Sequence, residues 1–184
     1  MQKRTILAAF LLAFGLTAQA QRFFTRDAKV QFNSETPLEK IEAVNKSGTA
    51  VFDAKTGQME WKVLIKSFLF ERALMQEHFN ENYMESNRYP SATFKGALMQ
   101  PADMDYKIPS VNKVRVKGAL TIHGVSKDIE VPGTITIGES TLTFQSTFTL
   151  SPADFGIDIP GVVRDKIAKT IVVKVNATLS PMNK

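Results

Sequence analysis

The decapeptide KVRVKGALTI, residues 113–122, carries the sharpest residue pattern of the chain. Small or apolar residues alternate with polar ones, namely Val114, Val116, Gly118, Leu120 and Ile122 against Lys113, Arg115, Lys117 and Thr121. Successive side chains of a β-strand point to opposite faces, so this alternation predicts a strand with one buried and one solvated face. A slip by one residue would bury the cationic side chains and lose about 1.5–3 kcal/mol for each aliphatic side chain exposed.

The same pattern continues on both sides of this segment. Toward the C terminus we expect strands over 129–137, 142–150 and 171–179, separated by turns at His123-Gly124 and Gly138-Glu139-Ser140 and by a connection over 160–168 with one helical turn. Toward the N terminus we expect strands over 29–34, 49–53, 59–67 and 92–98, with Gly57 in the turn of the 49–67 hairpin and a polar loop over 100–110.

Two segments predict helix instead. Thr36-Pro37-Leu38-Glu39 has the spacing of a capping box with proline at the first helical position, which predicts a short helix to about Val44. In the longer segment, 68–90, Met75, Phe79 and Tyr83 recur every four residues with Leu74 beside them, and Pro90 ends the pattern. This amphipathic helix needs an apolar surface on which to lie.

About eight strands with one wet face each, and one inserted helix, predict a mainly β fold. Each strand has a single face to bury, and closure of the sheet removes exposed edges, so we expect an antiparallel barrel of about eight strands. The inserted helix would cover one end of the barrel as a lid, and the remaining helical turns would be short.

The inward-facing residues are the first candidates for a binding site. They are apolar or aromatic, namely Phe32, Trp61, Val63, Phe94, Leu98, Leu120, Ile122, Ile135, Phe144 and Phe148, and small residues lie among them, namely Gly96, Gly118, Ser146 and Ala177. A hollow with this lining would select a long apolar molecule, at about 0.8 kcal/mol per buried methylene. The alternative is a filled core in which the small residues make room for aromatic rings. From the lid we add Leu74, Phe79 and Tyr83 to the candidates.

The first twenty residues read as a secretory signal peptide, and we expect the domain to cover residues 21–184. Lys3 and Arg4 precede an apolar run over 6–16 and the cleavage pattern Ala18-Gln19-Ala20. Cleavage would remove two of 23 basic residues and none of 18 acidic ones, leaving a formal charge of 21 − 18 = +3. The cationic residues are scattered, which argues against nucleic-acid binding. We therefore expect a periplasmic protein.

Catalytic and metal chemistry have little support. The chain has no cysteine, and its two histidines, His78 and His123, lack the spacing of a zinc site. No G-x-S-x-G elbow accompanies Ser126 near His123. We expect no metal, no cofactor and no enzymatic activity. The open alternative is an enzyme that acts on a lipid head group through His123 at the mouth of the barrel.

Several motifs resemble the YceI family of lipid- and polyisoprenoid-binding proteins. They are ALMQEHFNENYMES (73–86), Tyr89-Pro90, Phe94-Lys95-Gly96, GALTIHGVSK (118–127), Val131-Pro132-Gly133 and Asp154-Phe155-Gly156-Ile157. The resemblance spans nearly all of residues 21–184 and departs from the family at the opening strand, KVQFNS.

The resemblance implies a lipocalin-like antiparallel barrel in the bacterial periplasm that encloses an isoprenoid or a similar lipid. We therefore expect an exported protein that sequesters or carries an apolar lipid of the isoprenoid, quinone or fatty acyl type. The fourteen candidate ligand-binding residues are the inward and lid residues above together with His123. No nucleic acid is expected, while transient membrane contact and a homodimer remain open. An outer-membrane barrel would need an apolar outer face, whereas these outer faces are rich in Lys and Thr.

Overall fold

The computed structural model describes residues 22–99 and 104–182, so the predicted signal peptide lies outside the described residues. Eight long strands form one closed antiparallel barrel with a short ninth strand attached. The strands are β1 (Arg22–Glu35), β2 (Lys40–Asp53), β3 (Gln58–Leu64), β4 (Leu69–Phe70), β5 (Ser91–Leu98), β6 (Ser110–Ile122), β7 (Val125–Ile137), β8 (Leu142–Leu150) and β9 (Ile171–Pro181).

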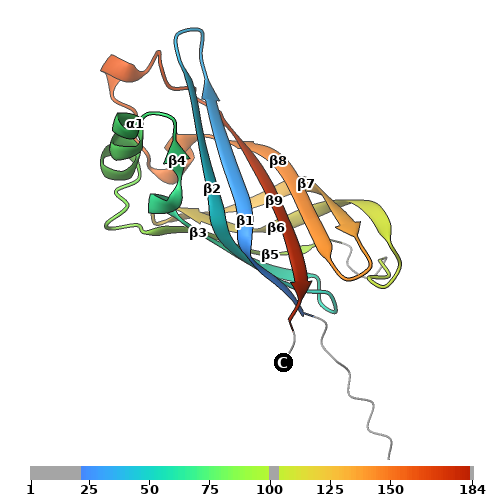
Figure 1. Cartoon of the computed structure of the whole chain (residues 1–184). Coiled ribbons are helices and arrows are strands. Elements are labelled where there is room, and N and C mark those ends of the chain that lie inside the picture. Colours follow the sequence, from blue (N-terminus) through green and yellow to red (C-terminus); the bar gives the residue numbers. More distant parts are fainter. Residues whose placement is uncertain (1–21, 100–103, 183–184) are drawn as a thin grey trace, which may run out of the picture.

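The barrel closes because β1 pairs with both β2 and β9. The strand order is β1-β9-β8-β7-β6-β5-β3-β2-β4, with the additional β1–β2 pairing. Both ends of the described chain lie at one end of the barrel (Figure 1), where the Met182 N–H donates to the Arg22 carbonyl at 2.7 Å. The predicted architecture is confirmed, and the predicted strand over 113–122 is the larger part of β6.

The predicted short helix after Thr36 is wrong. Residues 36–39 form the turn between β1 and β2, with Glu35 opposite Lys40. The Thr36 hydroxyl accepts the Glu39 N–H at 3.1 Å, as an N-cap side chain would, but the Thr36 N–H donates to the Glu39 carbonyl at 2.9 Å. The capping-box residues therefore close a hairpin, and β1 and β2 are fourteen-residue strands.

The predicted lid helix is present but shorter than expected. It consists of α1 (Ala73–His78) and a single π-helical turn, Phe79–Tyr83. The turn is marked by the Met84 N–H, which donates to the Phe79 carbonyl at 2.9 Å. Met75, Phe79 and Tyr83 are partly buried, as the apolar stripe predicts, while Leu74 is 61% exposed. Short 3-10 turns occur at Ile65–Ser67, Pro152–Phe155 and Gly161–Val163, the last of them inside the predicted 160–168 connection.

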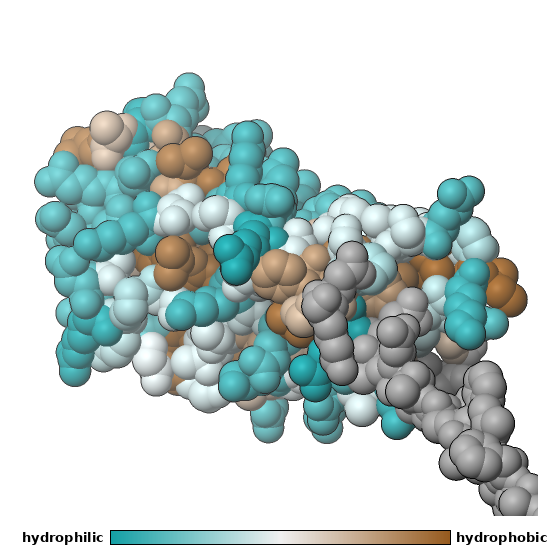
Figure 2. All heavy atoms as spheres, turned by 60° about the horizontal axis from the view of Figure 1, so that its bottom comes forward, coloured by the Kyte–Doolittle hydropathy of each residue, from teal (hydrophilic) through white to brown (hydrophobic). Residues whose placement is uncertain are grey.

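Packed side chains fill the barrel at the end near the chain termini. The buried cluster there contains Phe23, Phe52, Leu98, Ile135, Ile137, Leu142, Phe144 and Leu179. Phe52 and Phe144 pack edge to face with ring centroids 5.0 Å apart. On the face drawn in Figure 2, polar side chains surround separate apolar groups. This end of the barrel therefore matches the filled-core alternative.

Candidate functional site: an apolar cavity beneath the lid

The other half of the barrel is hollow. A cavity of about 390 Å³ lies between the strands and the lid, within the range of about 300–1,000 Å³ that ligand pockets occupy. Its wall is almost entirely apolar and comes from every strand of the barrel, with Val30, Phe32, Ile41, Trp61, Val63, Phe94, Leu120, Phe148 and Val173 among its residues.

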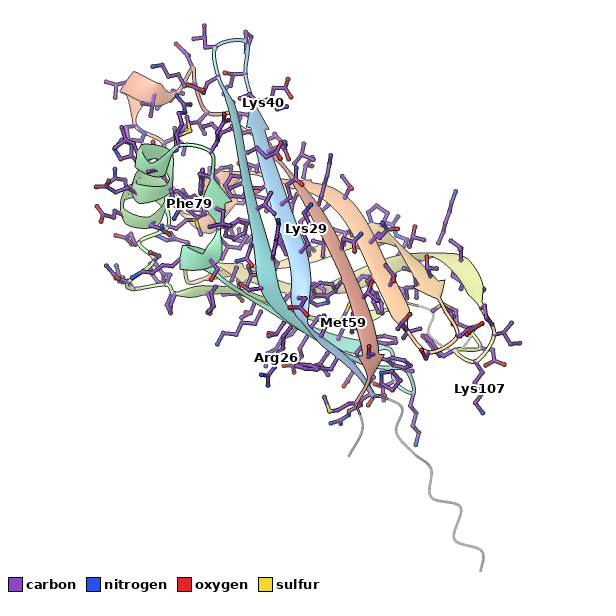
Figure 3. All side chains as sticks on the ribbon, viewed as in Figure 1. Arg26, Lys29, Lys40, Met59, Phe79 and Lys107 are labelled. Carbon is purple, nitrogen blue, oxygen red and sulfur yellow. The ribbon has the colours of Figure 1, made fainter. Side chains whose placement is uncertain are left out.

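The lid is held down by a cluster of aromatic rings. Phe79 packs on Phe32, Phe68 and Phe70 with centroid separations of 5.3, 5.7 and 5.0 Å. Figure 3 places Phe79 between the helical segment and the strands. Because the π-turn adds a residue to the helical period, Tyr83 and Met84 both border the cavity. The lid thus covers the cavity with apolar side chains and is packed against the strands.

Polar side chains border the cavity at the edge of the lid. They are Glu39 in the β1–β2 turn, His78 in α1 and Lys166 in the 160–168 connection. Arg72 Nη2 lies 2.6 Å from Glu39 Oε1 and ties α1 to the hairpin. The charged and titratable residues of the cavity border thus come from a turn, a helix and a connection, whereas the inward strand residues predicted from alternation carry no charge.

His123 lies in the β6–β7 turn and does not border the cavity. Its Nδ1 donates to the Phe155 carbonyl at 3.3 Å, and its Nε2 lies 3.1 Å from the Glu85 carboxylate. The Tyr89 ring packs against it with centroids 4.5 Å apart. Both ring nitrogens thus face protein acceptors, and His123 joins the turn to the segment that follows the lid.

The structure brings ten of the fourteen candidate residues to the cavity wall. These are Phe32, Trp61, Val63, Phe79, Tyr83, Phe94, Leu120, Ile122, Phe144 and Phe148. The other four do not border it. Leu74 points to solvent, Leu98 (4% exposed) and Ile135 (0% exposed) lie in the filled end, and His123 lies in its turn.

Sequence reasoning missed the residues that close the cavity from loops, short helical turns and the short strand β4. These include Phe68, Phe70, Met84, Ile157, Ile159, Val163 and Ile167. The run Ile157-Asp158-Ile159 alternates apolar and polar residues, and this alternation is the one sequence feature that could have indicated a buried contact. It lies between strands, where alternation does not indicate which surface it covers.

Among the described residues, no helix is long and apolar enough to cross a membrane. Within the same residues, no three His, Cys, Asp or Glu side chains gather as metal ligands would. The site is thus an apolar hollow with a polar rim. A site with this lining can shield an apolar chain from water.

Comparison with known proteins places this fold in a family. The YceI-like domain family matches residues 17–179. The chain belongs to the YceI-like family. No curated protein matches the sequence.

Solved structures share the fold of this YceI-like chain at low sequence identity. A polyisoprenoid-binding domain from Saccharophagus degradans, implicated in plant cell wall breakdown, is 13% identical, with a TM-score of 0.77 over 89% of this chain and 100% of that one. BcnA of Burkholderia cenocepacia is 23% identical, with a TM-score of 0.69 over 83% and 96%. The YCEI protein of Campylobacter jejuni is 16% identical, with a TM-score of 0.55 over the full length of both chains.

Proposed function

We propose that this YceI-like protein is an exported carrier that holds an isoprenoid, or another long apolar lipid, in the hollow half of its barrel. The observation that carries the proposal is the cavity of about 390 Å³ with an almost wholly apolar wall. Each methylene moved from water into such a wall contributes about 0.8 kcal/mol, so affinity would come from the chain of the lipid. Membership of the YceI-like family supports the proposal, as does the similarity of fold to a polyisoprenoid-binding domain.

The polar rim suggests where the polar end of a lipid would lie. Glu39, His78 and Lys166 border the cavity at the edge of the lid, so a hydroxyl or anionic end group would remain hydrated there while the chain occupies the interior. Export rests on the leader pattern of residues 1–20, and the periplasm is the proposed location. We propose binding and not catalysis, because His123 lies outside the cavity wall and contacts protein acceptors through both nitrogens.

Trp61 provides the test, because it is the single tryptophan of the chain and borders the cavity. Titration with geranylgeraniol, with a quinone and with a brominated fatty acid should change or quench its fluorescence with saturation. Native mass spectrometry should show one lipid per protein. Failure of all three probes to bind, together with no co-purifying lipid, would refute the proposal.

A matched pair of variants locates the binding. Ala92 borders the cavity opposite Val63, whereas Ala119 lies on β6 and does not border it. We expect Ala92→Phe to reduce uptake at least tenfold, because the added ring occupies the hollow, and Ala119→Phe to leave uptake unchanged. Circular dichroism should show both variants folded.

A further inference from the structure

Strands β7 and β8 separate halfway along the barrel. β6 pairs with β7 along its whole length, from Ser110–Ile137 to Ile122–Val125, and β8 pairs with β9 along its whole length. The β7–β8 pairing, in contrast, runs only from Ile137–Leu142 to Thr134–Gln145. Residues 125–133 of β7 and 146–150 of β8, called here the β7–β8 seam, face each other without a ladder, and the two ribbons diverge toward the lid (Figure 1).

Pro132 accounts for the end of the ladder. The Ser146 hydroxyl donates to the Pro132 carbonyl at 2.7 Å, so that carbonyl points toward β8. The N–H and C=O of a strand residue point to the same side, and the position at which β7 would next donate to β8 is therefore a proline without an N–H. A single side-chain hydrogen bond joins the strands at this point in place of a ladder.

The cavity extends to both sides of the seam. Its border includes Ile129, Val131, Gly133 and Thr134 from β7, and Gln145, Ser146, Phe148 and Leu150 from β8. Gln145 is exposed to solvent and borders the cavity as well. The hollow thus approaches the surface at Gln145, the last ladder partner of Thr134, where the backbone pairing of β7 with β8 ends.

The lid is held by aromatic contacts and by polar contacts at both of its ends. Phe79 contacts three other rings, and the ion pair of Arg72 and Glu39 and the contact of His123 with Glu85 hold its two ends. Separation of β7 from β8 would break the Ser146–Pro132 hydrogen bond without breaking a ladder. It would also part apolar side chains, including the buried Phe155 and Ile157, which share a hydrophobic cluster with Val125 and Ile129 of β7 and Phe148 and Leu150 of β8.

We propose that an apolar chain enters and leaves the cavity sideways, through the β7–β8 seam. This inference rests on the proposed function and adds the route by which the lipid reaches the cavity. The polar end of the ligand would stay in water during passage, while the chain slides between the apolar side chains of the two strands.

A reversible disulfide across the seam tests the route. The protein has no cysteine, and a Cβ built on Gly133 lies 3.9 Å from Ser146 Cβ, within the separation of about 3.5–4.5 Å that a disulfide requires. The variant G133C/S146C, oxidised, should take up and release geranylgeraniol at least tenfold more slowly than the same protein after reduction. Stopped-flow fluorescence of Trp61 measures both rates.

The control disulfide joins β8 to its other neighbour. Thr143 and Thr178 are partners in the β8–β9 ladder, with hydroxyl oxygens 2.9 Å apart, and neither borders the cavity. Oxidised T143C/T178C should exchange the probe at the rate of its reduced form. Equal exchange rates in oxidised and reduced G133C/S146C would overturn the proposal and assign entry to the edge of the lid.

A second readout separates this proposal from the proposed function. If the reduced protein binds no lipid probe, the carrier function fails. Quenching of Trp61 by trichloroethanol, a small apolar solute, then still compares access with the seam closed and open. Slower quenching only in oxidised G133C/S146C supports the seam, and unchanged quenching refutes it.

Discussion

Gly96 and Gly118 face each other across β5 and β6, and the Phe94 ring lies over both. A Cβ built on Gly118 would lie 2.8 Å from Phe94 Cζ, and one built on Gly96 would lie 2.5 Å from the same atom. Backbone oxygens of Lys95 and Lys117 lie closer still. These glycines therefore admit an aromatic ring to the wall of the cavity, which is the role that the filled-core alternative gave to small inward residues.

Gly118→Ala should accordingly destabilise the fold by about 1–3 kcal/mol, the usual cost of overpacking. The free energy of unfolding in guanidinium chloride measures the change. Gly161→Ala serves as the control, because a Cβ there meets no atom within 4 Å. If both variants unfolded at the parent's midpoint, the backbone of β5 and β6 as well as the Phe94 ring would have to shift without cost.

Tyr106 lies in the filled end against Phe52, and its hydroxyl has no hydrogen-bond partner among the described residues. Burial raises the pKa of Tyr106 to about 12, compared with about 10 in an unfolded chain. Between these values the unfolded chain loses the proton while the folded protein keeps it, so stability falls as the pH rises from 10 to 12.

Tyr106→Phe should remove that part of the pH dependence. We expect the variant to equal or exceed the parent in stability at pH 7, because an unpaired hydroxyl is removed. Its advantage should grow by about 1–2 kcal/mol between pH 10 and 12. Urea unfolding at several pH values measures the difference. A constant difference above pH 10 would show that Tyr106 ionises normally.

At the scale of elements, Phe79 makes the aromatic contacts that hold the lid on the barrel. Phe79 packs against Phe32, Phe68 and Phe70, and aromatic pairs contribute about 0.5–1.5 kcal/mol each beyond their burial. Leu74, one position before Met75 on the same helix, is 61% exposed and contacts no such cluster. The two residues therefore form a matched pair for testing the lid.

Phe79→Ala should destabilise the lid by about 3 kcal/mol, the lower end of the range for Phe-to-Ala changes. Leu74→Ala should change stability by less than about 0.5 kcal/mol. Hydrogen exchange should show faster exchange over 73–86 in Phe79→Ala while β6 remains protected. Uniformly faster exchange in all strands would instead make the lid part of the global folding unit.

The predicted helices also show what local sequence patterns cannot determine. The hydrogen bond from the Glu39 N–H to the Thr36 hydroxyl is compatible with a helix N-terminus and with a hairpin turn, so the spacing of these residues does not distinguish the two. Pairing of β1 with β2 along both strands outweighs the local helix preference. The π-turn could not be predicted either, because Met75, Phe79 and Tyr83 are four residues apart in the sequence whether the helix is α or contains a π-turn.

At the scale of the whole molecule, the barrel divides into a filled half and a hollow half. Phe52 is 1% exposed in the filled half and does not border the cavity. The filled core and the cavity thus lie toward different ends of the same sheet and meet at Phe144, which belongs to both.

Phe52→Leu should therefore lower stability by about 1–3 kcal/mol and leave lipid uptake, measured below the unfolding transition, unchanged. Thermal unfolding and Trp61 titration measure the two effects separately. A matched loss of affinity and stability would show that the two halves are coupled.

Apart from the start of β2, alternation of residues predicted where the strands lie, which faces are buried and that the sheet closes. It could do so because a one-residue slip of register would turn the whole apolar face of a strand to solvent. Eight of the ten strand residues that alternation directed inward border the cavity, and the helical stripe supplies two more, Phe79 and Tyr83. Alternation could not separate Leu98 and Ile135 from Trp61 and Phe94, since all four point inward. Whether an inward side chain meets a partner or an empty space depends on how far the opposite wall lies, and that distance is set by strand tilt, the lid and the departure of β7 from β8. These exist only in the folded barrel.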